Sequence, residues 1–415
     1  MRAELLAVGS ELLMPQRAES NGVYLTARLR EVGIDVQART TVADDLGVLE
    51  AALRGALARA DLVITTGGLG PTADDLTREA AAAALGRPLH RVPETVAWLE
   101  ARFARFGRPM APVNLKQADL IEGAVSLLNP RGTAPGQRVE VDGRLLILLP
   151  GPPREMEPMF EEQALPLLRA RGAGRVLLTR VLKIAGMGES DVEQRVAPIY
   201  TRYANPRTTI LGGPGQVELY LTAEAADAPA AGALLEELAA GLRAAIPGRV
   251  FSEDGAELPA TVAALLRERG ASLALAESCT GGLLAARLTD APGASAFLDR
   301  GYVTYSNRSK VEMLGVDPGV IEAKGAVSED VARAMAEGAQ RAAGTAIGIG
   351  ITRIAGPDGG SPEKPVGLVY VAIAGPAGDS VKRAHFPGDR DRVRHQATQL
   401  ALEMLRRGLL QLAPL

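Results

Sequence analysis

The side chains best suited to catalysing a reaction lie in the segment 276–282, whose sequence is AESCTGG. An apolar run precedes this segment and another follows it, a pattern that predicts a strand, a tight turn and a helix. Small residues and paired glycines leave backbone N–H groups open at the start of a helix, where negative charge is stabilised. The segment therefore predicts a nucleophile, Ser278 or Cys279, beside an anion-binding turn.

A nucleophilic hydroxyl needs a base within hydrogen-bond reach. Of the three histidines in the chain, only His385 and His395 lie in the same part of the sequence, and His395 falls in a charged helical pattern typical of a surface. Lys310 is the alternative, because it stands near a predicted helix start. Burial and a helix N-terminus both disfavour an ammonium group and lower its pKa toward that of a usable base. A pair of Ser278 and Lys310 is therefore chemically reasonable.

Cys279 is the rival nucleophile, because a thiolate near a helix N-terminus is highly reactive. A lone cysteine is, however, more often a small buried hydrophobic residue. Consecutive residues after a strand point to opposite sides, so only one of Ser278 and Cys279 readily faces the site. The sequence alone leaves this choice open. The single cysteine also excludes an intrachain disulfide framework and a four-cysteine zinc site.

Two other segments of the C-terminal part carry groups that bind amides or anions. Residues 348–360 read as a strand that runs into a glycine-rich loop, with the Thr352 hydroxyl at the junction. Residues 386–394 contain several arginines, whose guanidinium groups suit phosphate. The same arginine pattern also fits a salt-bridged helix start.

A second candidate site lies in residues 67–77, which read GGLGPTADDLT. Glycines allow close approach of a phosphate to the backbone, and an aspartate can hold a divalent cation that bridges to it. Asp44 and Asp45 follow the preceding predicted strand, at the end where ligands bind in open α/β sheets. Without a metal ion these carboxylates would repel a phosphate, so the segment predicts a pyrophosphate together with a divalent metal ion. The alternative for Asp74 and Asp75 is an acidic helix start.

Three parts of the chain position these segments. Strand and helix patterns alternate over residues 1–168, which predicts a three-layer α/β domain with a parallel or mixed sheet. Residues 169–252 predict a small α+β module, and residues 256–415 predict a second α/β domain. The predicted strands are residues 3–8, 34–40, 62–66, 145–149, 176–184, 217–223, 271–276, 302–305, 346–351 and 367–374. The predicted helices are residues 21–32, 46–60, 190–200, 230–246, 258–269 and 328–343.

Composition argues against several classes of protein. The 415 residues carry a formal net charge of −3, whereas a nucleic-acid binder usually shows a basic surplus. Acidic and basic residues also balance within the middle module. Neither a run of about 18 apolar residues nor a cationic leader followed by an apolar stretch stands out. We expect a cytoplasmic protein that binds neither nucleic acid nor membranes.

The C-terminal segments together resemble the C-terminal domain of the CinA family, the nicotinamide mononucleotide deamidases. The resemblance rests on AESCTGGLLAARLTDAPGAS, VTYSNRSK, GAVSEDVA, GITRIAGPDGGSPEKPVG and HFPGDRDRVR. It implies hydrolysis of the carboxamide of nicotinamide mononucleotide to the nicotinate nucleotide and ammonia, without a cofactor. It makes Ser278 the nucleophile and Lys310 its base. The substrate-binding residues that it implies are Tyr305, Thr352, Arg392, Thr280, Gly281 and Gly282. Arg392 is then placed at the phosphate and the backbone amides of residues 280–282 at the oxyanion. The family usually has glycine where Arg353 stands.

Residues 1–168 resemble the molybdopterin-binding-like domain of the same family, through AVGSELL, VADD, TTGGLGPTADDLTREA, NLKQA, NPRGTAPG and LLPGPPREM. The resemblance implies metal-dependent hydrolysis of ADP-ribose to AMP and ribose 5-phosphate. It makes Asp44 and Asp75 the catalytic acids, with Asp75 as the metal ligand. The nucleotide-binding residues that it implies are Gly67, Gly68, Gly70, Ser10 and Asn21. Ser10 stands where the family typically has threonine, a change that keeps the hydroxyl.

The middle module resembles the small KH-like module of the same proteins. Its Gly186-Met187-Gly188 sequence lacks the GxxG spacing that clamps nucleic-acid backbones. The resemblance thus spans the whole chain and implies a bifunctional hydrolase of pyridine nucleotide recycling. It also implies a homodimer whose partners are small-molecule nucleotides. Two alternatives stay open: a molybdopterin nucleotidyl transferase in the N-terminal domain, and a non-catalytic partner protein linked to competence or DNA damage.

Overall fold

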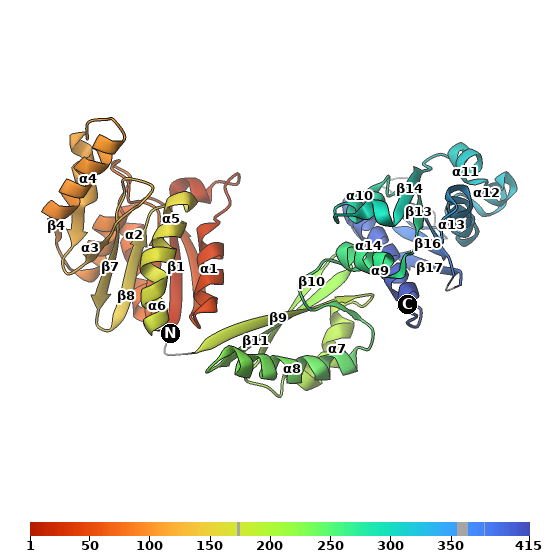
Figure 1. Ribbon diagram of the computed structural model, residues 1–415, viewed down its shortest axis with the longest axis horizontal. Coiled ribbons are helices and arrows are strands. Elements are labelled where there is room, and N and C mark those ends of the chain that lie inside the picture. Colours follow the sequence, from red (N-terminus) through yellow and green to blue (C-terminus); the bar gives the residue numbers. More distant parts are fainter. Residues whose placement is uncertain (172–174, 355–363, 377) are drawn as a thin grey trace. The chain divides into compact units, whose positions relative to one another are not determined.

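A computed structural model of the protein describes residues 1–171, 175–354, 364–376 and 378–415. Internal contacts divide the chain into two compact units, Met1–Leu178 with Ala223–Ala233 and Thr179–Thr222 with Leu234–Leu415. Figure 1 shows the chain and labels most of its helices and strands. Within the described ranges, none of the helices combines the length and the apolar character that a membrane span requires.

A six-stranded mixed sheet forms the centre of the first unit, in the order β2-β1-β3-β8-β7-β6. The first four strands in this order are parallel, and β7 and β6 are each antiparallel to the strand before them. The strand bounds are β1 Arg2–Val8, β2 Asp35–Val42, β3 Leu62–Thr66, β6 Val125–Leu127, β7 Gly136–Val141 and β8 Arg144–Leu149. A separate antiparallel pair consists of β4 Leu89–Arg91 and β5 Asp119–Ile121.

Both faces of this sheet are buried, because its central strands are almost continuously apolar. Alternate residues of β1, such as Leu5 and Leu6, enter two different cores. One core packs against α1, α5 and α6 and the other against α2 and α3, which gives three layers (Figure 1). The helix bounds are α1 Asn21–Glu31, α2 Leu46–Arg59, α3 Thr77–Leu85, α4 Pro93–Arg105, α5 Pro153–Met159 and α6 Leu165–Arg171. Short 3-10 segments at Ser10–Leu13 and Pro112–Ala118 and a π turn at Phe160–Ala164 complete this part.

The middle module consists of a four-stranded sheet with the order β10-β11-β9-β12 and two helices. The strand bounds are β9 Val176–Ala185, β10 Arg207–Gly213, β11 Gln216–Ala225 and β12 Val250–Ser252, and the helices are α7 Glu189–Tyr200 and α8 Ala228–Ala245. Strands β10 and β11 form an antiparallel hairpin. The sequence did not predict β10 and β12, because neither segment shows a clear alternation of apolar and polar residues.

A five-stranded sheet with the order β14-β13-β15-β16-β17 forms the C-terminal domain. Strands β14, β13 and β15 are parallel, whereas β16 and β17 are antiparallel to their neighbours. The strand bounds are β13 Leu273–Glu277, β14 Leu298–Val303, β15 Ile347–Arg353, β16 Leu368–Ala374 and β17 Ser380–His385. Helices α9 Leu258–Arg269, α10 Leu283–Thr289 and α14 Arg390–Leu409 cover one face. Helices α11 Asn307–Leu314, α12 Pro318–Lys324 and α13 Glu329–Ala343 cover the other.

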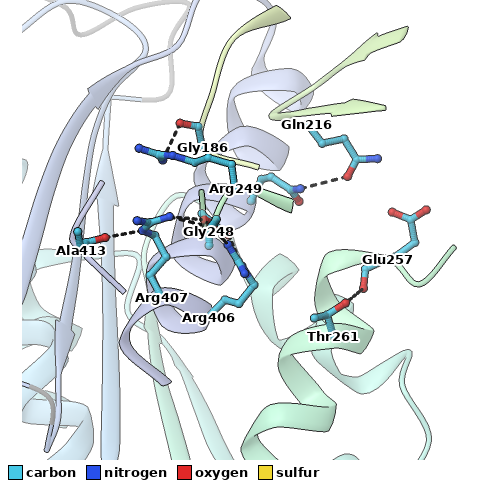
Figure 2. Close-up of polar contacts among 11 residues, drawn as sticks. Gly186, Gln216, Gly248, Arg249, Glu257, Thr261, Arg406, Arg407 and Ala413 are labelled. Carbon is cyan, nitrogen blue, oxygen red and sulfur yellow. Dashed lines mark hydrogen bonds and ion pairs between the residues drawn. The ribbon is translucent and has the colours of Figure 1, made fainter. Parts of the chain in front are cut away.

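The last helix, α14, connects the C-terminal domain to the middle module through a buried charge network. Glu403 is 1% exposed and pairs with both Arg406 and Arg407. Both guanidinium groups also donate to the Gly248 carbonyl of the middle module, at 2.6 and 3.2 Å (Figure 2). A buried pair holds only when its remaining hydrogen bonds are satisfied, and the Gly248 carbonyl supplies an acceptor for each arginine.

The architecture confirms the predicted α/β class, with two mixed sheets each covered on both faces by helices. Residues 367–374 were predicted as a strand and form β16, whereas β6, β7 and β17 at the antiparallel edges were not predicted from the sequence.

Candidate functional site

The end of β13 and the start of α11 bring Ser278 and Lys310 together. Ser278 follows β13 directly and is 9% exposed, and the Lys310 Nζ lies 3.2 Å from the Ser278 Oγ. Ser306 caps α11 by accepting from the Ser309 N–H, which fixes the helix start. The Lys310 Nζ also donates to the Thr304 carbonyl at 2.9 Å. These contacts place an amine beside a hydroxyl at the C-terminal end of a parallel strand, where α/β sheets carry their sites.

Lys310 is 1% exposed. Burial lowers the pKa of its ammonium group, because a low-dielectric surrounding disfavours the charged form. A thiolate at Cys279 would act in the opposite direction and raise that pKa. The net effect favours the neutral amine, which is the form that can accept a proton.

Cys279 lies on the opposite side of the strand end from Ser278. It is 5% exposed and belongs to the core that packs against α9, α10 and α14. Burial raises the pKa of the Cys279 thiol to about 11 despite the nearby Arg353 guanidinium, so the thiol stays protonated at neutral pH. Since the thiolate is the nucleophilic form, the geometry favours Ser278 over Cys279, a choice that the sequence alone left open.

Glu277 holds the turn after Ser278 in place and was not recognised in the sequence. Its carboxylate is 1% exposed and accepts from the backbone N–H groups of Gly282, Leu284 and Ala285 at 2.9–3.1 Å. It therefore satisfies the first amides of α10, which have no partner within the helix. The signal was an acidic residue at the end of an otherwise apolar strand, seven positions before the second residue of the helix.

The proposed oxyanion site at residues 280–282 needs a correction. The Gly281 N–H donates to the Ser278 carbonyl and the Gly282 N–H donates to Glu277. Both amides are thus already used within the turn, and Gly282 serves as the left-handed residue before α10. The Thr280 N–H has no acceptor within the described part of the chain, so it is the remaining amide of the three for a developing oxyanion.

The other C-terminal residues named from the sequence are spread around this centre. Tyr305 is 59% exposed and its hydroxyl accepts from Arg390 at 2.6 Å. The Thr352 hydroxyl is buried and donates to the Ala326 carbonyl at 2.8 Å. Most of the predicted glycine-rich loop, residues 355–363, lies outside the described residues.

Arg392 is not brought to Ser278 by any described contact. It lines a separate cavity between the middle module and α14, together with Arg249 and Lys382. Arg394, by contrast, donates to the Thr280 carbonyl at 2.9 Å. On helix α14, residues 390 and 394 share a face that residue 392 does not. The helical period therefore turns Arg390 and Arg394, rather than Arg392, toward the turn that carries Ser278.

Arg353 ends β15 beside this turn with an unusually buried guanidinium. It is 4% exposed, and its Nη2 donates to the Arg390 carbonyl at 3.4 Å. Its Nε and Nη1 atoms have no hydrogen-bond partner within the described ranges, although the thiol of Cys279 lies close enough to interact electrostatically. Burial lowers its pKa, and the neighbouring Arg390 and Arg394 act in the same direction. Three guanidinium groups thus gather on the α14 side of Ser278.

The N-terminal site is a cavity of about 550 Å³ at the ends of β1, β3 and β8. Its walls combine carboxylates, glycine-rich backbone and two exposed arginines, Arg131 and Arg154. The predicted residues that line it are Asp44, Gly67, Gly68, Gly70 and Asp75, with Asp74 and Glu155 as further acids.

Asp44 and Asp75 each bind the backbone of a neighbouring turn. Asp44 accepts from the Ser10 N–H at 2.7 Å, while the Ser10 Oγ accepts from the Asp44 N–H at 3.0 Å. Asp75 accepts from both the N–H and the hydroxyl of Thr72. The Asn21 side chain donates to the Gly151 carbonyl at 2.7 Å, and its buried Oδ1 has no donor within the described residues.

The glycine loop is shaped by steric limits and by a buried arginine. Gly67 has a φ of +102°, and a Cβ there would lie 2.1 Å from the Val8 carbonyl oxygen, so no other residue fits. Arg78 is fully buried and donates to the carbonyls of Leu69 and Gly70 at 2.7 and 2.8 Å. Lys116 donates to the carbonyls of Thr72 and Asp75. Arg78 and Lys116 lie in motifs named above, but the sequence indicated no role for either side chain.

The donor set fits a divalent metal ion only in part. In the described ranges, no group of three or more His, Cys, Asp or Glu side chains is placed to hold a metal ion. Asp44, Asp74 and Asp75 nevertheless line one cavity and offer hard oxygen ligands. Mg²⁺ is often held by one or two carboxylates with water and substrate phosphates completing the shell. The residues present fit a metal ion that binds together with a phosphorylated ligand.

Fold and sites together define a protein with two mixed-sheet α/β domains, each with a polar site at its strand ends, joined by a small α+β module. Three family models match the chain: "Probable molybdopterin binding domain" over residues 4–170, "Damage-inducible protein CinA KH domain" over residues 179–252 and "CinA C-terminal domain" over residues 255–409. The chain belongs to the CinA family.

Similar proteins extend over the full chain. A CinA-like protein of Solibacter usitatus is 46% identical over 407 residues, which cover 98% of each chain. One of Koribacter versatilis is 47% identical and covers 99% of this chain and 100% of its own. The crystal structure of a competence/damage inducible protein from Agrobacterium tumefaciens is 39% identical over 36% of this chain and 94% of its own, with a TM-score of 0.35.

Replacing Glu277 by Gln should destabilise the second unit and misplace Ser278. The amide offers one acceptor instead of a charged pair and points an N–H₂ group at backbone donors. Hydrogen bonds to a buried charged group are worth about 1.5–3 kcal/mol each, so we expect a loss of about 2 kcal/mol or more in the free energy of unfolding, measured in urea. Glu312→Gln, which alters an exposed carboxylate on α11, should change it by less than about 0.5 kcal/mol. Equal effects of the two changes would contradict this role.

Proposed function

We propose that the C-terminal domain is a serine amidohydrolase that converts nicotinamide mononucleotide to nicotinate mononucleotide and ammonia. The observation that carries this proposal is the 3.2 Å contact between the Ser278 Oγ and the buried Lys310 Nζ. A hydroxyl beside an amine whose pKa is lowered is the arrangement that a serine nucleophile with a lysine base requires.

The reaction follows from the positions of these groups. Lys310, in its neutral form, takes the proton from Ser278 as the Oγ attacks the carboxamide carbon. The Thr280 N–H donates to the developing oxyanion, a contact typically worth about 3 kcal/mol in the transition state. Collapse of the intermediate expels ammonia, which receives a proton from Lys310. Water, activated by Lys310, then hydrolyses the ester to the carboxylate and restores Ser278.

The arginines beside the turn support a substrate with a phosphate. Arg390 and Arg394 contact Tyr305 and the Thr280 carbonyl, and guanidinium groups bind phosphate through paired donors. This geometry favours Arg390 and Arg394 for the phosphate role that the family resemblance gave to Arg392.

Ser278→Ala should abolish ammonia release from nicotinamide mononucleotide by the purified protein, with a fall of about 10³-fold or more in kcat. Lys310→Met should produce a similar loss, since removal of a general base costs about 10²–10⁴-fold. Cys279→Ala provides the matched control, because the thiol lies in the core and should be dispensable. A fully active Ser278→Ala variant, or an inactive Cys279→Ala variant beside it, would transfer the nucleophile to the cysteine.

The pH dependence follows from the lowered pKa of Lys310. Because the base acts in its deprotonated form, kcat/KM should fall as the pH drops below that pKa and reach a plateau above it. The midpoint should lie below the ordinary lysine value of about 10.4. Steady-state rates of ammonia release across pH 5–10 measure this profile. A rate that keeps rising up to the ordinary lysine pKa, or that falls with increasing pH, would contradict Lys310 as the base.

We further propose that the N-terminal domain hydrolyses ADP-ribose to AMP and ribose 5-phosphate. The supporting observation is one cavity lined by Asp44, Asp75, the glycine loop and two exposed arginines. Asp44 and Asp75 would hold a divalent cation together with the pyrophosphate. Such a cation would supply Lewis-acid polarisation of the phosphoryl group, which favours attack of water at phosphorus and departure of the second phosphate. Lys116 and Arg78 keep the loop that carries Asp75 in position. A nucleotidyl transferase would use the same loop, so product analysis separates the two activities.

Incubation with ADP-ribose and Mg²⁺ or Mn²⁺ should yield AMP, measured by liquid chromatography. Chelation of the metal should stop the reaction. Asp75→Asn should lower kcat by about 10²-fold or more, because it removes a charged oxygen from the site. Glu94→Gln, an exposed change on α4, should leave the rate unchanged. Absence of AMP with any divalent metal would refute this second activity while leaving the deamidase proposal untouched.

A further inference from the structure

The N-terminal cavity is lined by an aromatic side chain that has no role in the proposed hydrolysis. Phe106 is the C-cap residue of α4 and lines the same cavity as Asp44, Gly67 and Arg131. It is 50% exposed, although an aromatic side chain gains much by burial. The other side chains of this wall are mainly polar or charged. An exposed ring among them offers a flat apolar surface to a bound molecule.

One face of the Phe106 ring is covered by a cation. The guanidinium carbon of Arg102 lies 5.1 Å from the ring centroid, in the geometry of a cation–π contact. The same guanidinium donates to the carbonyls of Gly132 and Pro130. Arg102 therefore links the ring to the loop of residues 130–132, part of which also lines the cavity.

That loop is itself rigidly held. Asn129 is fully buried, and its Oδ1 accepts from the N–H groups of Arg131 and Gly132 at 2.9 and 2.7 Å. Its Nδ2 donates to Glu155 at 2.8 Å. A Cβ on Gly132 would lie 2.0 Å from a Glu155 oxygen, so the loop packs closely on that carboxylate. The ring is consequently presented in a fixed position, which limits the entropy lost when a ligand stacks on it.

Charge and shape together indicate the class of ligand. Arg131 and Arg154 line the cavity as exposed cations suited to phosphate, and the glycine loop allows close approach of phosphate oxygens. Any of the nucleobases can stack on an aromatic side chain, because each of them has a planar π-face. A cavity with a fixed ring and phosphate-binding cations matches a nucleotide rather than a phosphorylated sugar.

We propose that Phe106 is the stacking platform for the base of a nucleotide bound in the N-terminal cavity, and that it determines the preference for nucleotides over phosphosugars. The inference rests on the proposed N-terminal function for the nature of the ligand, but it does not require hydrolysis. Arg102 acts through Phe106 and is a positioning residue.

The test compares the binding of AMP and ribose 5-phosphate to the full chain by isothermal titration calorimetry in the presence of Mg²⁺. The two probes share the phosphate and the ribose and differ in the base. The unaltered protein should bind AMP at least about tenfold more tightly. Phe106→Leu should remove about that factor for AMP and leave ribose 5-phosphate unchanged, whereas Phe106→Tyr should keep the preference. Phe103→Leu, on the same helix but outside the cavity wall, is the matched control.

Each alternative outcome is decisive. Equal loss for both probes in Phe106→Leu would mean that the ring only supports the fold, and unchanged AMP binding would mean that the base lies elsewhere. Failure of the unaltered protein to prefer AMP, or to bind either probe, would also overturn the proposal. Because no turnover is needed, a protein that binds AMP through Phe106 but releases no AMP from ADP-ribose would refute the proposed hydrolysis and keep the stacking role.

Discussion

The geometry of the candidate site in the second unit depends on one buried carboxylate. Parallel strand β13 must turn into α10 within a few residues, which leaves the first amides of the helix without acceptors. Glu277 accepts three of these N–H groups from the end of the strand. The turn that carries Ser278 is thereby held from inside the protein, and its hydroxyl is left to face Lys310. A charged group that is 1% exposed is tolerated here because its carboxylate accepts three backbone hydrogen bonds.

In the first unit, cationic side chains rather than a carboxylate bind the backbone groups that the loop leaves without partners. Its glycine loop after β3 has carbonyl groups that no strand or helix satisfies, and the buried Arg78 guanidinium donates to two of them. Lys116 does the same for the carbonyls of Thr72 and Asp75. In one domain the buried Glu277 carboxylate binds amides of the turn that carries Ser278. In the other, the fully buried Arg78 and the partly exposed Lys116 bind carbonyls of the loop that carries Asp75. In both sites the backbone of the loop is hydrogen-bonded from inside the protein, while Asp44 and Asp75 also accept hydrogen bonds from neighbouring turns.

The sequence predicted those parts of the fold and site that depend on local patterns. The apolar strands β1, β3 and β13, the helix α9 and the Ser328 cap of α13 follow from periodicity and capping. A strand end and a helix start made the pairing of Ser278 with Lys310 one of several possibilities, and the family resemblance selected it. The phosphate role of Arg392 relied on the resemblance alone, and the helical period turns Arg390 and Arg394 toward the site instead. The roles of Glu277 and Arg78 could not be predicted, because they depend on which backbone groups a turn leaves unsatisfied.

Arg353 is another buried charged residue of the C-terminal candidate site. Arg353 is 4% exposed, and its guanidinium contacts a thiol and a carbonyl. Its neighbours Arg390 and Arg394 add positive charge beside it, and Arg394 is paired with Asp391 at 3.5 Å. An accumulation of cations disfavours folding unless an anion offsets the repulsion, and it lowers the cost of binding one. In the proposed deamidase, a phosphorylated substrate bound beside these arginines would offset part of their repulsion, which would couple substrate binding to the stability of the turn that carries Ser278.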